Sequence, residues 1–343
     1  MARSQRSVVG SKTWFLAVLV GASCAAAPGR GADPACDAAG AAVAAAVAAP
    51  LTFSSDVSIV HVHVTVTRDD EPLDAPLDAA AFRVSEDGRP QEIAYFAHEN
   101  VPVSYTLLVD VSSSMNPRLR LVLEALETFV RTMRPVDRAS LVLFDTTTQV
   151  LQEETGDKKA LLAATDRIPD HFEAGTALYE ALYARLWTAI ESGAGRDAAL
   201  PARRALVVFS DGKDEVSRRS FRGAVLDAAR RADVAVYPVA LSFHDGFLER
   251  IARETGGRVA YVSHGGELAA AYRAIAAEVA SQYTIGYVPG GVPAAGAWRP
   301  VRVRVAREGV TVRHRAGYFA PRTGIALQPA GCRPPGALPR ALD

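Results

Sequence analysis

The sequence predicts an α/β protein: a Rossmann-like, doubly wound, mainly parallel sheet with helices on both faces, plus a small β domain. Two observations support this fold class. Between residues 103 and 282, short apolar runs alternate with amphipathic segments of helical period, the pattern of buried strands joined by covering helices. On either side of that region, apolar residues recur with the period of strands alone. We therefore expect the flanking segments to pack together as one β domain into which the α/β unit is inserted.

Each predicted element follows from periodicity and from the turn residues that bound it. In the first flank, valines at every second position predict a strand over 57–67, and Asp87-Gly88 predicts a hairpin turn between strands over 82–86 and 91–96. In the α/β unit we expect strands over 103–109, 139–144, 148–152 (an edge strand), 205–209, 234–241 and 258–262. Helices are expected over 119–133, 157–168, 177–191, 219–232, 246–255 and 267–281. The last flank predicts strands over 283–288, 301–305 and 310–315.

Composition divides the chain of 343 residues into six segments. We expect a signal peptide over 1–27, an Ala-rich linker over 28–50, a β-rich segment over 51–99, the α/β domain over 100–282, a C-terminal β segment over 283–320 and a disordered tail over 321–343. The tail is rich in Pro, Gly and Ala, so it offers little apolar surface to bury.

The N-terminus has the order of charges and apolar residues typical of a signal peptide. An apolar run over 14–22 is followed by Ala25-Ala26-Ala27, a small-residue cleavage site. The run is preceded by three basic residues, Arg3, Arg6 and Lys12. Because the run is short for a membrane span, we expect export to the periplasm, envelope or medium, with an uncleaved N-terminal anchor as the alternative.

The three cysteines leave two questions open. Cys24 follows Gly21-Ala22-Ser23, which resembles a bacterial lipoprotein signal except that Gly21 stands where a large aliphatic residue is usual. Lipidation of Cys24 is therefore a second possible route to a membrane. Cys36 and Cys332 could pair in an oxidising compartment, and two unpaired thiols are equally compatible with the sequence.

Charge and motif content argue against several classes of function. The chain has 38 basic and 38 acidic residues, so no basic excess indicates nucleic-acid binding. It lacks a G-x-S-x-G nucleophile elbow, a Gly-rich phosphate loop with Lys, and a G-x-G-x-x-G turn after a strand. We therefore do not expect an enzyme.

Three segments place oxygen-bearing side chains at the ends of predicted strands or at the start of a predicted helix. Asp110, Ser112 and Ser114 follow the strand over 103–109, Thr176 precedes a helix, and Asp211 follows the strand over 205–209. Singly, each could be a turn or a helix N-cap. Together, at the edge where open α/β sheets bind ligands, they predict a site for a hard cation such as Mg²⁺.

These five residues resemble the metal-ion-dependent adhesion site (MIDAS) of von Willebrand factor type A (VWA) domains, which combines D-x-S-x-S with a distant Thr and a distant Asp. The resemblance covers residues 103–282. It implies that the Ser112 and Ser114 hydroxyls contact the metal, that Thr176 does so mainly with ligand bound, and that Asp110 and Asp211 act largely through water. The metal would be Mg²⁺, with Mn²⁺ or Ca²⁺ as alternatives. Ser113 departs from the family, in which Gly is frequent there.

A narrower resemblance extends into the flanks. The segments Val84-Ser85-Glu86-Asp87-Gly88-Arg89-Pro90-Gln91, Gln282-Tyr283-Thr284-Ile285-Gly286-Tyr287 and Arg315-Ala316-Gly317-Tyr318-Phe319 are similar to exported VWFA-related proteins of acidobacteria.

The first flank holds two histidines on one face of its first strand, His61 and His63. They could bind a metal, but no third ligand follows at suitable spacing. We therefore expect a solvent-facing strand edge instead.

The sequence thus predicts an exported adhesion-type protein that binds a carboxylate of a protein partner through a divalent cation. The alternatives are a metal-dependent hydrolase, for which no general base is identifiable, and a structural envelope protein whose metal stabilises the fold.

Overall fold

The structure is a computed structural model that describes residues 59–98, 101–169, 171–172, 175–192, 202–211, 214–217, 222–241, 244–262, 265–290 and 294–320. The predicted signal peptide, linker and tail, together with Cys24, Cys36 and Cys332, lie outside these residues. Among the helices of the described ranges, none is both long enough and apolar enough to cross a membrane.

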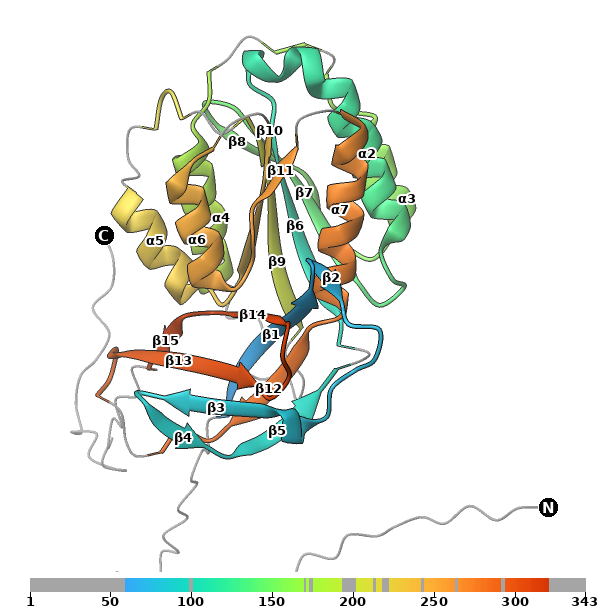
Figure 1. Ribbon diagram of the computed structural model, residues 1–343. Helices are drawn as coiled ribbons and strands as arrows, with labels where there is room; N and C mark the ends of the chain where they lie inside the picture. Colours follow the sequence, from blue (N-terminus) through green and yellow to red (C-terminus); the bar gives the residue numbers. More distant parts are fainter. Residues whose placement is uncertain are drawn as a thin grey trace, which may run out of the picture. The chain divides into compact units, whose positions relative to one another are not determined.

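A six-stranded sheet forms the centre of the α/β unit, in the order β11-β10-β9-β6-β7-β8 (Figure 1). All neighbours are parallel except β8, which pairs antiparallel with β7 at one edge. The chain leaves β6 for β7 on one side and later returns to β9 on the other, so the strand order reverses at β6. Ligands of open α/β sheets bind at such a reversal. The strands are β6 (Val103–Asp110), β7 (Arg138–Phe144), β8 (Thr148–Thr155), β9 (Arg203–Ser210), β10 (Ala235–Leu241) and β11 (Ala260–Val262).

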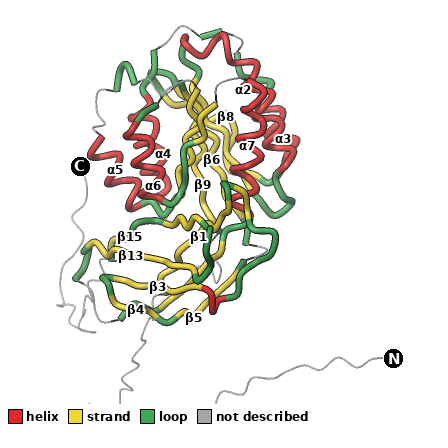
Figure 2. The backbone as a smooth tube through the Cα atoms, in the orientation of Figure 1, coloured by secondary structure: helices red, strands yellow, loops and turns green. Residues whose placement is uncertain are grey.

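Helices cover both faces of this sheet (Figure 2). One core cluster lies between the sheet and α2 (Leu119–Thr132), α3 (Lys158–Thr165) and α7 (Gly265–Ala280). The other lies between the sheet and α4 (Leu178–Glu191), α5 (Arg222–Arg231) and α6 (Gly246–Thr255). Since both faces are buried, the strands are nearly uninterrupted apolar runs, as the sequence pattern requires.

Two packed sheets form the β domain, in the orders β14-β1-β12-β5 and β15-β13-β3-β4. The first includes β1 (Val60–Arg68), β5 (Ile93–Ala97), β12 (Tyr283–Tyr287) and β14 (Thr311–His314), with β2 (Glu71–Pro72) beside β1. The second includes β3 (Phe82–Glu86), β4 (Arg89–Gln91), β13 (Trp298–Val305) and β15 (Gly317–Phe319). Strands from the two flanks alternate in the first sheet, and in the second sheet β13 of the C-terminal flank pairs with β3 of the first flank, so neither flank can complete a sheet alone. The predicted fold class, with the α/β unit inserted in a β domain, is confirmed.

Two expectations about this domain are wrong. Residues 91–96 do not form one strand: β4 ends at Gln91, and β5 begins at Ile93 in the other sheet. A two-sheet packing lets the chain change sheets at such a corner, which periodicity cannot reveal. The strand with His61 and His63 is no edge either, because β1 lies between β12 and β14.

Candidate metal centre

Asp110 is the last residue of β6, and its side chain is 0% exposed. Its Oδ1 accepts a hydrogen bond from the Ser112 backbone N–H at 2.9 Å. Its Oδ2 accepts one from the Ser210 hydroxyl at 2.6 Å, and Ser210 is the last residue of the neighbouring strand β9. The carboxylate is therefore held from two sides, at the point where the strand order reverses.

The two hydroxyls that follow lie beside one another. Ser112 Oγ and Ser114 Oγ are 3.1 Å apart. Neighbouring ligands of an octahedral Mg²⁺ at about 2.1 Å from the ion are about 3.0 Å apart, so this separation fits two ligands of one cation. Ser112 makes no side-chain capping bond to the 3₁₀ turn that begins at Ser113, so the N-cap alternative does not account for its hydroxyl.

Electrostatics also suit a cation here. The pKa of Asp110 is raised from its ordinary value to about 6, chiefly because burial disfavours the charged form. Hydrogen bonds from Ser210 and Ser112 oppose this rise, and the charge of Asp211 adds to it. A positive charge beside the two aspartates would relieve both destabilising effects.

Thr176 is 1% exposed and belongs to a loop fixed by backbone hydrogen bonds. Its carbonyl accepts from the N–H groups of Glu215 at 2.8 Å and Val216 at 3.1 Å, and the next residue, Ala177, donates to the carbonyl of Asp145 beyond the end of β7. The N-cap of α4 is Ala177, without a side-chain capping bond, so Thr176 is not the cap that the simpler alternative requires.

Asp211 follows β9 directly and is 7% exposed. It lies close enough to Asp110 for its charge to raise the pKa of that carboxyl. The structure therefore brings Asp110, Ser112, Ser114 and Asp211 together and holds the Thr176 loop against the segment that follows Asp211. Metal binding by these residues stays a prediction.

Two neighbouring residues, Ser210 and Asn116, were missed by sequence reasoning. Ser210 had a visible signal, since it ends a buried strand next to Asp211. Asn116 had none: its side chain donates to the Phe172 carbonyl at 2.8 Å and accepts from the Phe172 N–H at 3.0 Å, which ties two loops of the site together. Glu215, four residues after Asp211, also lies near the site, since a Cβ added at Gly175 would lie 3.2 Å from its Oε2. A further carboxylate thus stands beside Thr176.

The two histidines of β1 have a structural setting rather than a metal-binding one. His63 is half-buried, and its Nδ1 lies 3.1 Å from Thr284 Oγ1. No group of three or more His, Cys, Asp or Glu side chains that could hold a metal occurs within the described ranges.

The fold and site define a doubly wound α/β protein with an oxygen-rich site at the carboxyl ends of its central strands. Residues 106–274 match the family model of the von Willebrand factor type A domain. The chain therefore contains a VWA domain over these residues, as the D-x-S-x-S pattern predicted. A search among curated proteins found no match.

Several solved structures are similar to part of the chain. An aerotolerance-related membrane protein from Bacteroides fragilis is 19% identical, with 52% of this chain and 98% of that chain covered and a TM-score of 0.41. A von Willebrand factor type A protein from Catenulispora acidiphila is 15% identical, with 79% and 76% covered and a TM-score of 0.45. Proximal thread matrix protein 1 from the mussel byssus, with a zinc-occupied MIDAS motif, is 15% identical, with 54% and 50% covered and a TM-score of 0.44. At this level of similarity they add nothing to the assignment of the site.

Proposed function

We propose that Asp110, Ser112, Ser114, Thr176 and Asp211 bind a divalent cation, and that the domain uses it to bind a carboxylate of a protein partner. The observation that carries this proposal is the pair of hydroxyl oxygens 3.1 Å apart, next to a buried carboxylate. An all-oxygen set of this kind favours Mg²⁺, with Mn²⁺ and Ca²⁺ as alternatives.

The division of roles follows from where each side chain lies. Ser112 and Ser114 supply neutral oxygens, while Ser210 and the Ser112 backbone orient the carboxylate of Asp110. When bound, the cation supplies a positive charge that neutral hydroxyls leave only partly compensated, and so attracts an anionic group.

The carboxylates near the site make the binding of a partner depend on the positive charge of the cation. Asp110 and Asp211 lie together at the site, Glu215 lies beside the Thr176 loop, and without a cation their negative charges repel a carboxylate. With a cation bound, the sign of the local field favours the same carboxylate. We therefore infer a protein ligand with an Asp, a Glu or a terminal carboxylate, and binding rather than turnover.

The first test measures Mg²⁺ binding by titration calorimetry. We expect Ser112→Ala to weaken Mg²⁺ binding by about tenfold or more, because a direct ligand is lost. Ser113→Ala is the matched control, since Ser113 lies in the same loop but is exposed. Equal affinities in the two variants would contradict the assignment of ligands.

The second test asks whether the cation serves partner binding, stability of the fold or catalysis. Envelope extract is passed over immobilised wild type and Asp110→Ala, with and without a chelator, and melting temperatures are measured in parallel. Partner capture that chelation abolishes and Mg²⁺ restores supports adhesion. Unchanged capture with a lowered melting temperature indicates that the metal only stabilises the fold. Hydrolysis of an ester or phosphoester that Asp110→Ala abolishes indicates an enzyme.

We also infer export, with the first 27 residues as a signal peptide. Expression of the full chain in a bacterial host, followed by fractionation and N-terminal sequencing, tests this inference. Cleavage after Ala27 is expected. A lipid on Cys24 or an intact N-terminus would indicate one of the two modes of membrane attachment instead.

A further inference from the structure

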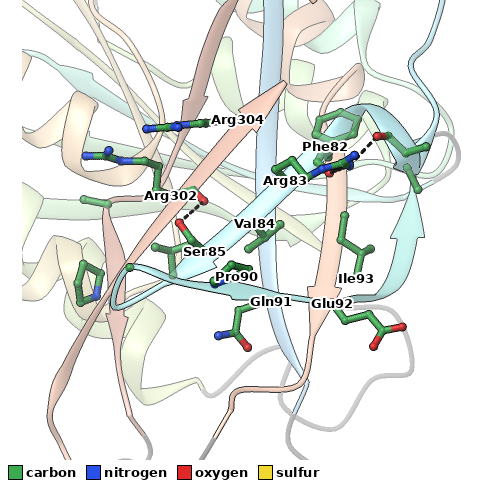
Figure 3. Close-up of a pocket in the computed structure, with 16 residues that line it drawn as sticks. Phe82, Arg83, Val84, Ser85, Pro90, Gln91, Glu92, Ile93, Arg302 and Arg304 are labelled. Atoms are coloured by element: carbon green, nitrogen blue, oxygen red, sulfur yellow. Dashed lines mark hydrogen bonds between the residues drawn. The ribbon is translucent and has the colours of Figure 1, made fainter. Parts of the chain in front are cut away.

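The outer face of the sheet β15-β13-β3-β4 forms a hollow of about 1050 Å³ (Figure 3). Residues that point outward from β3 and β13 line it, including Arg83, Ser85, Arg302 and Arg304. The residues between them on the same strands, such as Val84 and Val303, are buried in the core of the β domain, and Val84 also borders the hollow. The hollow therefore has exposed arginines on one side and apolar residues of that core beside them.

The hollow carries a cluster of basic side chains. Arg83, Arg302 and Arg304 are exposed, and Arg83 is the register partner of Arg304 on the neighbouring strand. Like charges directly opposite one another on a sheet destabilise it. Arg83 donates to the carbonyls of Ala80 and Phe82, and none of the three arginines forms an ion pair within the part of the chain that the structure describes.

The arrangement of these arginines suits an extended anionic chain. Arg302 and Arg304 are two residues apart on β13, so their Cα atoms are about 7 Å apart and their side chains share a face. Figure 3 shows them extending side by side in one direction. An extended peptide has the same spacing between alternate side chains, so carboxylates at alternate positions can meet successive arginines.

We propose that this hollow binds an extended acidic peptide of a partner protein, with Asp or Glu at alternate positions and its axis along β13. Ser85 and Gln91 add polar groups to the lining, and Glu92 marks the end where an acidic peptide is not favoured. A concave face does not fit a planar lipid surface, and the balanced charge of the whole chain does not favour a nucleic acid. This site lies in a different sheet from the candidate metal centre and needs no cation.

The test is peptide binding by fluorescence anisotropy at low salt, with excess chelator present. The probe is a labelled Thr-Glu-Thr-Glu-Thr-Glu-Thr peptide, and its isomer with contiguous glutamates is the comparison. We expect the alternating peptide to bind more tightly. Arg302→Ser with Arg304→Ser should weaken its binding by about tenfold, because two partly exposed ion pairs are lost. The matched control is Arg273→Ser with Arg307→Ser, which removes the same charge from exposed positions outside the hollow.

A second readout separates a binding role from damage to the fold. Arg304→Thr removes one member of the like-charge pair with Arg83, so its melting temperature should rise by about 1–2 °C while peptide affinity falls. No binding by the wild type, equal weakening in both double variants, or equal affinity for the two peptides would overturn the proposal. Binding of phosphatidylglycerol vesicles or of single-stranded DNA in place of the peptide would overturn it as well. Since chelator is present throughout, these results are independent of the outcome at the metal centre.

Discussion

Ser210 acts on the candidate site through Asp110. Its hydroxyl donates to Asp110 Oδ2 at 2.6 Å, from the end of the neighbouring strand. We expect Ser210→Ala to weaken Mg²⁺ binding by about tenfold, since an outer partner that orients a ligand typically contributes that much. Titration calorimetry measures the effect, and Ser140→Ala, a serine on β7, is the control. An unchanged affinity would show that the backbone of Ser112 suffices to orient Asp110.

The ionisation of His63 makes the stability of the fold depend on pH. The pKa of His63 is lowered to about 4, chiefly by burial; Asp233 opposes this shift, and the charges of Arg203, Arg315 and His61 add to it. The unfolded chain, with a His pKa of about 6.5, therefore binds more protons than the folded protein between pH 6.5 and 4. The contribution of neutral His63 to the unfolding free energy is therefore complete above pH 6.5 and is lost as the pH falls toward 4.

We expect His63→Gln to reduce the slope of unfolding free energy against pH in that window. Urea denaturation at a series of pH values measures it. His171→Gln is the control, because His171 is exposed. Slopes that agree in the wild type and both variants would show that His63 is not the group responsible.

At the scale of elements, each end of α6 has a glycine, and we expect replacement of the two glycines by alanine to change the stability in opposite directions. Gly256 caps the helix with φ +86°, and a Cβ there would lie 2.7 Å from the backbone carbonyl carbon of His314 on β14. Gly246 begins the helix, with nothing within 4 Å of an added Cβ. Gly256→Ala should therefore lower the unfolding free energy by at least about 1–2 kcal/mol. Gly246→Ala should raise it by about 0.4–1 kcal/mol. Thermal unfolding of both variants tests this pair, and a shift of the same sign in both would contradict it.

Sequence patterns predicted the elements of the α/β unit better than those of the β domain, for a physical reason. Helix α6 was predicted with its observed bounds, because a 3.6-residue apolar stripe, an N-cap Asp245 and a C-terminal Gly256 are all local signals. The break between β4 and β5 depends on which sheet each half joins, which is a tertiary choice. Short strands such as β15 have too few residues for any period to appear.

The polar sites also differ in how far the sequence predicts them, because some of their residues are close in the sequence and others are brought together only by the fold. Asp110, Ser112 and Ser114 lie within five positions of one another and could be grouped from the sequence. Glu86 could not: its carboxylate accepts hydrogen bonds from Tyr287 on β12 and Tyr318 on β15, and pairs with Arg299. The segments 84–91, 282–287 and 315–319 thus meet at one buried carboxylate, which only the packed sheets bring together.

At the scale of the whole molecule, Arg203 joins the α/β unit to the β domain. It begins β9, is 0% exposed, and donates to the carbonyls of His98, Val279, Ala280 and Gln282. Burial lowers its pKa to about 10, so it stays charged at neutral pH. Its guanidinium therefore meets the C-terminal carbonyls of α7, where a cation is favoured.

We expect Arg203→Leu to lower the unfolding free energy by about 3 kcal/mol or more, because several buried carbonyls lose their donor. We also expect its calorimetric unfolding to separate into two transitions, one for each part of the molecule, whereas the wild type unfolds in one. Arg273→Leu, at an exposed position of α7, is the control. A single transition at a lowered temperature would show that the two parts stay coupled without Arg203.

The inserted topology has a mechanical consequence under the proposed function, in which the domain holds a partner. The α/β unit is entered after β5 and left before β12, and these two strands are hydrogen-bonded to each other, with Ala97 opposite Thr284. The candidate site lies at the other end of β6, so tension on a bound partner reaches both connections at once and pulls them in the same direction. The two strands are then pulled together rather than sheared against each other, and β12 is in turn held to β1 by five residue pairs, from Val60↔Tyr287 to Val64↔Tyr283.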